Sequence, residues 1–178
     1  DIKELDKFSI PICNTPDYGT EEVADTAIAM ILTLHRSVLE YNYVAKEFDS
    51  SWINNTYRPI RRSNKSIVGI IGIGRIGTAV INRLKSFGFK IIGYDPYQPS
   101  GHEKAIGYER VHKLDDLLEK SDIVSIHTPS TNETKGMVDL EFFKRMKKGS
   151  IFINTARGSI LKDLDCLHQA LKNNFINS

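Results

Sequence analysis

The stretch SIVGIIGIGRIGTAVINRLKSFGFKIIGYD, residues 66–95, decides the fold. It begins with an apolar run typical of a buried strand, residues 67–71, which leads into the glycine pattern G-x-G-x-x-G. An amphipathic segment and a second apolar run follow, and the stretch ends at Asp95. Strand, glycine turn, helix, strand and acid, in this order, form the pattern that binds a dinucleotide.

The three glycines have different expected roles. Gly72 allows a tight turn, Gly74 lets the backbone approach a pyrophosphate, and Gly77 lets the helix pack closely on the strand. The start of the helix then offers free N–H groups and a partial positive charge to the phosphates. The sequence therefore predicts a nucleotide site at this loop.

Asp95 is the candidate ligand for the ribose. It follows Gly77 by 18 residues, close to the spacing of about 20 expected of an acid that binds the ribose hydroxyls. Its charge would repel a 2′-phosphate, and no arginine or lysine directly follows it, so NAD is favoured over NADP. The alternative role of Asp95 is that of a turn residue before Pro96.

The bulk composition is that of an ordinary globular protein. The 178 residues are 40% hydrophobic and 26% charged, and this length suits one domain, or one domain with a fragment of another. A net charge of +2 is too small to argue for nucleic acid or a membrane surface. Cys13 and Cys166 have neither zinc nor disulfide-framework spacing, so we expect a reducing cytoplasm and no metal site. We find no membrane span or signal peptide.

The rest of the chain alternates between strand and helix patterns. Further strands are predicted at residues 10–13, 122–126 and 151–154. Helices are predicted at residues 20–48, 114–118, 140–146 and 164–171. Residues 101–110 are predicted to form a loop, with a short edge element at Val111. Parallel neighbours need such crossovers, so we predict an α/β fold with a doubly wound parallel sheet. The predicted helix begins at Thr20, which we expect to be its N-cap. It is long enough to cross between domains or to lie in a subunit interface. A plain core helix is equally consistent with this length.

The polar segment between that helix and the glycine stretch, residues 49–64, is rich in basic side chains. Arg58, Arg61 and Arg62 lie in it and Lys65 follows. We interpret these bases as part of a solvated connector, with a nucleic-acid patch as the alternative.

Ligands of a doubly wound sheet bind beyond the carboxyl ends of its strands. The segments 72–77, 95–97, 127–129 and 155–158 occupy such positions. In the last, Arg157 has the chemistry to clamp a carboxylate, or it forms a surface ion pair. His127 either lines the cofactor crevice or is structural. No complete catalytic set is visible from the residues alone.

The sequence resembles the NAD-binding half of the D-isomer-specific 2-hydroxyacid dehydrogenases, a family that also contains the corepressors called C-terminal binding proteins. The resemblance rests on CNTP at 13–16, EEVAD at 21–25, GIGRIG at 72–77, YDPY at 94–97, HTP at 127–129 with Thr131 and Thr134, and NTARG at 154–158. These stretches span nearly the whole chain.

The resemblance implies the domain organisation and the site. Residues 1–19 would be the end of a substrate domain and its hinge, and residues 20–178 an NAD-binding domain (Rossmann-type), incomplete at its C-terminus, within a two-domain protein. Arg157 would be catalytic, orienting the substrate carboxylate and keto group. The cofactor-binding residues would be Gly72, Gly74, Arg75, Ile76, Gly77, Asp95, His127, Thr128, Pro129, Thr134, Thr155, Ala156 and Arg157.

The activity implied is hydride transfer between NAD and a D-2-hydroxy acid or 2-keto acid. In the family the catalytic glutamate and histidine lie downstream of the NTARG motif, beyond Ser178, so we expect the 178-residue chain to bind NAD without turnover. The expected partners are the small acid substrate and a second copy of the chain, through the helix at 20–48. The alternative is an NAD(H)-binding corepressor or scaffold.

Overall fold

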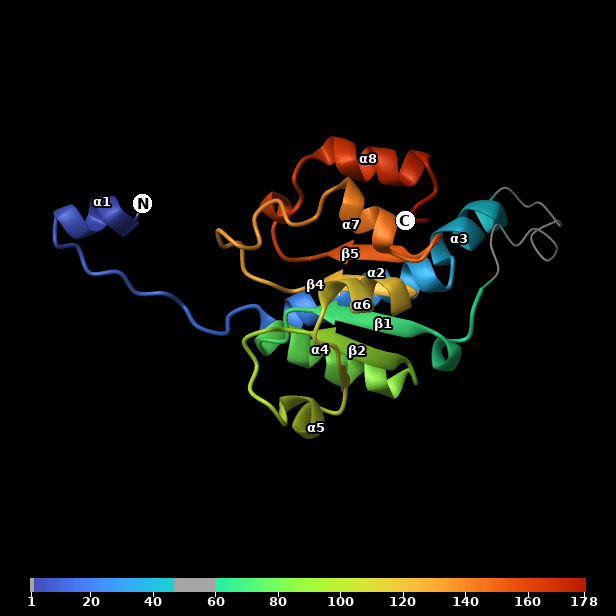
Figure 1. The fold of residues 1–178 in the computed structure, drawn as a ribbon, viewed down its shortest axis with the longest axis horizontal. Helices are drawn as coiled ribbons and strands as arrows, with labels where there is room; N and C mark the ends of the chain where they lie inside the picture. The colour runs from blue at the N-terminus through green and yellow to red at the C-terminus, as the bar shows by residue number, and fades with distance from the viewer. Residues whose placement is uncertain (1, 47–59) are drawn as a thin grey trace.

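A single parallel sheet lies at the centre of the protein (Figure 1). The computed structural model describes residues 2–46 and 60–178. Within them the strands have the order β3-β2-β1-β4-β5, and every neighbouring pair is parallel. The strands are β1 (Ile67–Ile71), β2 (Lys90–Tyr94), β3 (Glu109–Arg110), β4 (Ile123–Ile126) and β5 (Ile151–Asn154). The predicted doubly wound α/β fold is confirmed.

Helices connect the strands and cover both faces of the sheet. The helices are α1 (Ile2–Lys7), α2 (Thr20–His35), α3 (Val38–Lys46), α4 (Arg75–Ser86), α5 (His102–Ile106), α6 (Leu114–Lys120), α7 (Leu140–Arg145) and α8 (Leu164–Lys172), with 3-10 turns η2 (Ser63–Lys65) and η3 (Gly158–Ile160). None of the helices in the described ranges is long and apolar enough to cross a bilayer.

The side chains of β1, β2, β4 and β5 alternate between two buried layers. From β1, Val68 and Ile70 pack with the apolar faces of α2 and α4, whereas Ile71 packs with α6 and α7. In Figure 1, α6 lies in front of the sheet and α4 behind it. Burial of both faces explains why the strands are continuous apolar runs instead of alternating ones.

The carboxyl ends of four strands lie level with one another. Ile71 at the end of β1 is paired with Tyr94 of β2 on one side and Ile126 of β4 on the other. Ile126 is in turn paired with Asn154 of β5. The residues that follow these strands are therefore brought to one edge of the sheet, the left-hand side of Figure 1.

The single helix predicted for residues 20–48 is two helices in the structure. The first, α2, ends at His35, and α3 begins at Val38, because Ser37 adopts a left-handed conformation with φ of 53°. The amide of Tyr41 bonds to the carbonyl of Ser37 at 3.0 Å and starts the second helix. No glycine or proline marks this break in the sequence. Residues 47 and 48 lie outside the described ranges.

Three local predictions were also wrong. Thr20 is the first residue of α2 and not its cap, because the Gly19 carbonyl accepts the first helical bond, from Val23 at 3.1 Å. Residues 10–13 are exposed, extended chain with no strand partner in the described sheet. They belong to an arm that leads to α1, away from the domain (Figure 1). The loop predicted at 101–110 contains α5 and β3, and β3 ends next to Val111 as expected.

Candidate functional site

The glycine loop occupies the centre of the carboxyl edge, between the ends of β2 and β4. Gly72 has φ of 85°, and its amide donates to the carbonyl of Tyr94 at 3.0 Å. A Cβ placed on Gly72 would lie 2.8 Å from Cγ2 of Thr128. One on Gly77 would lie 2.2 Å from the carbonyl oxygen of Gly72. The turn and the close packing of α4 on β1 therefore both require glycine.

Gly74 has the opposite surroundings. Apart from Gly74 itself and its neighbours along the chain, no atom lies within 4 Å of the position that its Cβ would take, so the space above the loop is open. Gly74 is also the N-cap of α4, and no side chain caps the helix. The first helical bond runs from the Thr78 amide to the Gly74 carbonyl, at 2.9 Å. The preceding amides of Arg75 and Ile76 come before this first bond and have no helical acceptor, which suits an anion such as a pyrophosphate.

Asp95, at the end of β2, ties the loops of this edge together. Its Oδ2 accepts a bond from the amide of Ile73 at 2.7 Å, and its Oδ1 accepts one from the amide of Tyr97 at 2.9 Å. The turn role that we considered for Asp95 is therefore present. Each carboxylate oxygen has a second lone pair, so the contacts leave acceptor capacity for ribose hydroxyls.

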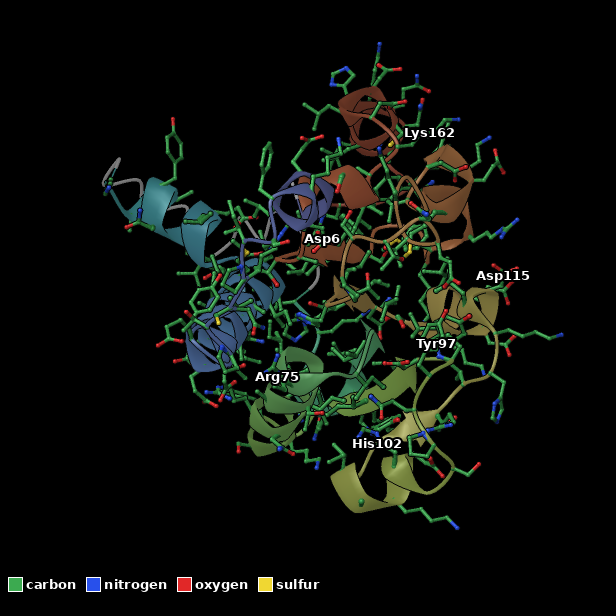
Figure 2. All side chains as sticks on the ribbon, turned by 90° about the vertical axis from the view of Figure 1, so that its left-hand side faces the viewer. Asp6, Arg75, Tyr97, His102, Asp115 and Lys162 are labelled. Carbon is green, nitrogen blue, oxygen red and sulfur yellow. The ribbon has the colours of Figure 1, made fainter. Side chains whose placement is uncertain are left out.

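Gln98 was not singled out in the sequence and supports the same loop. Its Nε2 donates to the carbonyl of Ile73 at 2.8 Å, so Ile73 is held through both its amide and its carbonyl. Figure 2 looks onto this edge and shows Arg75 at the start of α4 and Tyr97 on the segment after β2. A glutamine four residues after the end of a strand carries no sequence signal for this contact.

His127 follows β4, and its side chain is half-buried. Its Nε2 lies 2.9 Å from Oγ of Ser125, and its Nδ1 lies 3.5 Å from Oγ1 of Thr155. Burial lowers the pKa of His127 from 6.5 to about 4, because the charged form loses hydration. His127 therefore connects the ends of β4 and β5 as an uncharged group. Ser125 was not anticipated as its partner.

The segment after His127 forms a compact turn at the same edge. The hydroxyl of Thr134 donates to the carbonyl of Pro129 at 2.6 Å and accepts from the amide of Thr131 at 2.8 Å. Oγ1 of Thr128 is buried and has no hydrogen-bond partner among the described residues. An orphaned hydroxyl beside the glycine loop suits a site that receives a polar ligand.

Arg157 follows β5 and is exposed at the same edge. The side chain of Asn154 fixes its backbone: Oδ1 accepts from the amide of Ala156 at 3.0 Å and Nδ2 donates to the carbonyl of Arg157 at 3.1 Å. The Arg157 guanidinium donates to the carbonyl of Ala156 at 2.8 Å, and no carboxylate pairs with it in the described ranges. The surface ion pair that we considered is absent from that part of the chain.

The start of α2 also faces the glycine loop. Asp17 and Thr20 line an open cavity of about 590 Å³ together with Gly74 and Arg75. The structure thus brings to one edge the predicted segments after β1, β2, β4 and β5 and the helix start near Thr20. The open cradle above Gly74 and the orphaned Thr128 hydroxyl fit a dinucleotide. No group of potential metal ligands occurs among the described residues.

The fold and this edge define the class of protein, a Rossmann-type dinucleotide-binding domain. Residues 28–178 match the sequence model of the NAD binding domain of the D-isomer specific 2-hydroxyacid dehydrogenases. The chain belongs to this family, and its cofactor is NAD. The resemblance noted from the motifs is thereby confirmed.

Individual relatives agree with the family assignment. The chain is 39% identical to a glyoxylate reductase of Korarchaeum cryptofilum over 99% of its own length and 53% of that protein's. It is 33% identical to C-terminal-binding protein 1 of Caenorhabditis elegans over 99% of its length and 25% of that protein's. The D-lactate dehydrogenase of Aquifex aeolicus, solved with NAD and lactic acid, superposes with a TM-score of 0.89 at 34% identity, covering all of this chain and 52% of the other. The chain thus spans about half the length, or less, of these relatives.

Proposed function

We propose that the chain is the cofactor-binding half of an NAD-dependent 2-hydroxyacid dehydrogenase. NAD, when bound, accepts a hydride from a hydroxy acid, and NADH returns one to a keto acid. The observation that carries the proposal is the position of Arg157, exposed beyond β5 at the edge that contains the glycine loop. A guanidinium with no carboxylate partner among the described residues suits bidentate recognition of a substrate carboxylate there.

We further propose the division of labour among the other residues. The amides of Arg75 and Ile76 hold the pyrophosphate, and Asp95 accepts from the adenosine ribose. Thr128, Pro129, Thr134, Thr155 and Ala156 line the crevice along the ends of β4 and β5. His127 does not suit the acid–base role, because its pKa of about 4 leaves it unprotonated at neutral pH. We place the proton-transferring group outside residues 1–178, which therefore bind NADH without turnover.

The test is an assay of the full-length protein with NADH and a panel of 2-keto acids that includes glyoxylate and pyruvate. With the best substrate, Arg157→Gln is expected to lower kcat/KM on the order of a thousandfold, since a charge-assisted bidentate contact is lost. NADH affinity is expected to stay within about twofold, measured by fluorescence titration. Arg157→Lys keeps the positive charge but lacks the planar guanidinium that can donate two parallel hydrogen bonds, so its kcat/KM should recover only part of the way to that of the unmodified protein. Unchanged kcat/KM in Arg157→Gln would refute the role of Arg157.

A second function has an observation in its favour, the 33% identity to the C-terminal-binding protein of C. elegans. Under this alternative the domain binds NAD(H) to stabilise an assembly and recruits partner proteins. It predicts tight NADH binding, NADH-dependent association of the full-length protein in sedimentation experiments, and no turnover of any 2-keto acid in the panel. Turnover at ordinary enzymatic rates would favour the dehydrogenase.

A further inference from the structure

A second cavity, of about 500 Å³, lies at the amino edge of the sheet, opposite the glycine loop. Most of its lining residues precede β1, β4 and β5, and they include Arg61, Asp122, Lys147, Lys148 and Ser150. His35 at the end of α2 and Asn177 near the C-terminus complete the wall. The five residues of β1, at about 3.3 Å each, place this cavity roughly 15 Å from the cofactor loop. The two cavities therefore cannot share one small ligand.

Asp122 organises the positive charge of this cavity. Its Oδ1 accepts bonds from Nη1 of Arg61 at 2.6 Å and from Nζ of Lys147 at 3.1 Å, and its Oδ2 accepts from the amide of Ile67 at 2.9 Å. The carboxylate is only 12% exposed. One fixed carboxylate thus orients two cations, and Lys148 adds a third, so positive charge is in excess.

A tight turn presents the remaining groups. The amide of Ser150 donates to the carbonyl of Lys147 at 3.0 Å, and Gly149 supplies the positive φ, 75°, that this turn needs. Ser150 is only 3% exposed, and its hydroxyl has no partner among residues 2–46 and 60–178. A buried hydroxyl without a partner is unfavourable unless a ligand or water completes it. The exposed Lys148 side chain has no carboxylate partner within the same ranges.

We propose that this cavity binds the phosphate group of a small phosphorylated metabolite. Phosphate carries more than one negative charge and several acceptor oxygens, so it can engage Arg61, Lys147 and Lys148 at once and accept from Ser150. The volume is that of a small-molecule site. A cavity of this volume that contains a carboxylate favours a small ligand over nucleic acid, which is bound along an extended basic surface.

The experiment is a titration of the full-length protein with inorganic phosphate, followed by calorimetry at constant ionic strength. Saturating NADH is present so that the cofactor crevice is filled. Saturable binding is expected, and Lys148→Gln should weaken it on the order of tenfold, because a charge-assisted contact is lost. Ser150→Ala should weaken it several-fold. The matched control is Lys144→Gln, which removes the same charge from an exposed lysine that pairs with Glu141 at 2.7 Å outside the cavity, and it should leave the affinity unchanged.

Equal phosphate affinity in Lys148→Gln and the unmodified protein would overturn the proposal, as would phosphate binding no better than chloride. Binding of an oligonucleotide that Lys148→Gln weakens, without saturable phosphate binding, would assign the surface to nucleic acid instead. If Ser150→Ala fails to fold, the exposed Lys148 variant, checked by thermal unfolding, carries the test alone. None of these outcomes depends on whether the full-length protein reduces a keto acid.

Discussion

The carboxylate of Asp95 accepts a hydrogen bond from the amide of Ile73 at 2.7 Å, which fastens the end of β2 to the middle of the glycine loop. The other oxygen holds the amide of Tyr97 at 2.9 Å. The residue proposed to select the ribose thus also shapes the loop that receives the pyrophosphate. Cofactor choice and loop geometry depend on the same side chain.

Replacing Asp95 with alanine should therefore affect NAD more than NADP, but not NAD alone. We expect the affinity for NAD to fall at least about tenfold, because a charged acceptor of the ribose hydroxyls is lost. The affinity for NADP should fall less, since removal of the carboxylate also removes repulsion of the 2′-phosphate. Fluorescence titrations with NADH and NADPH measure both. Equal losses for the two cofactors would leave Asp95 with the turn role only.

Gly74→Val should abolish NADH binding and leave the fold intact. A Cβ at this position meets no protein atom within 4 Å, and its φ of −78° is open to any residue. The added side chain would instead fill the space proposed for the pyrophosphate. We expect thermal unfolding within a few degrees of the unmodified protein and no saturable NADH binding. Undiminished NADH affinity would show that the cofactor lies elsewhere.

Gly77→Ala should have the opposite effect and lower stability. Its new methyl carbon would lie 2.2 Å from the Gly72 carbonyl oxygen, so α4 must move away from β1. We expect the free energy of unfolding to fall by about 2 kcal/mol or more, as for other overpacked sites. Urea unfolding measures it, with Gly74→Ala as the matched control because that methyl group has open space. Equal stability of the two variants would contradict the close-packing role of Gly77.

His127 should make stability depend on pH in the acidic range. Its pKa is about 4 in the folded protein and 6.5 when unperturbed, so below pH 6.5 the unfolded chain binds a proton that the native chain excludes. The free energy of unfolding should therefore fall as pH drops from about 6.5 to about 4, by on the order of 3 kcal/mol from this group.

The measurement is urea unfolding across this pH range for the unmodified protein and for His127→Gln, which has no titrating ring. In this variant, the part of the pH dependence of the unfolding free energy that comes from His127 is expected to disappear. The control is His112→Gln, an exposed histidine of the same sequence, which should keep the slope. Parallel pH curves for His127→Gln and the unmodified protein would show that His127 is not held neutral by burial.

The sequence predicted the sheet core well because its signals are local. The apolar runs, the spacing from Gly72 to Gly77 and the interval to Asp95 specify strand, turn, helix and strand without reference to distant residues. The same local pattern, with the NTARG motif, identified the family. The break at Ser37 was not predictable in this way, because residues 35–37 contain no helix-breaking glycine or proline.

The sequence by itself determined which cofactor the chain binds and which segments follow the strands. Only the tertiary structure decided how those segments meet: that Asp95 holds Ile73, that burial keeps His127 neutral, and that Asp122 gathers Arg61 and Lys147 at the opposite edge. The physical reason is that hydrogen bonds, desolvation and charge clustering depend on distances in space. The partners come from different elements of the fold, and Arg61 and Asp122 are 61 residues apart in the sequence. The spacing of residues along the chain does not reveal such distances in space.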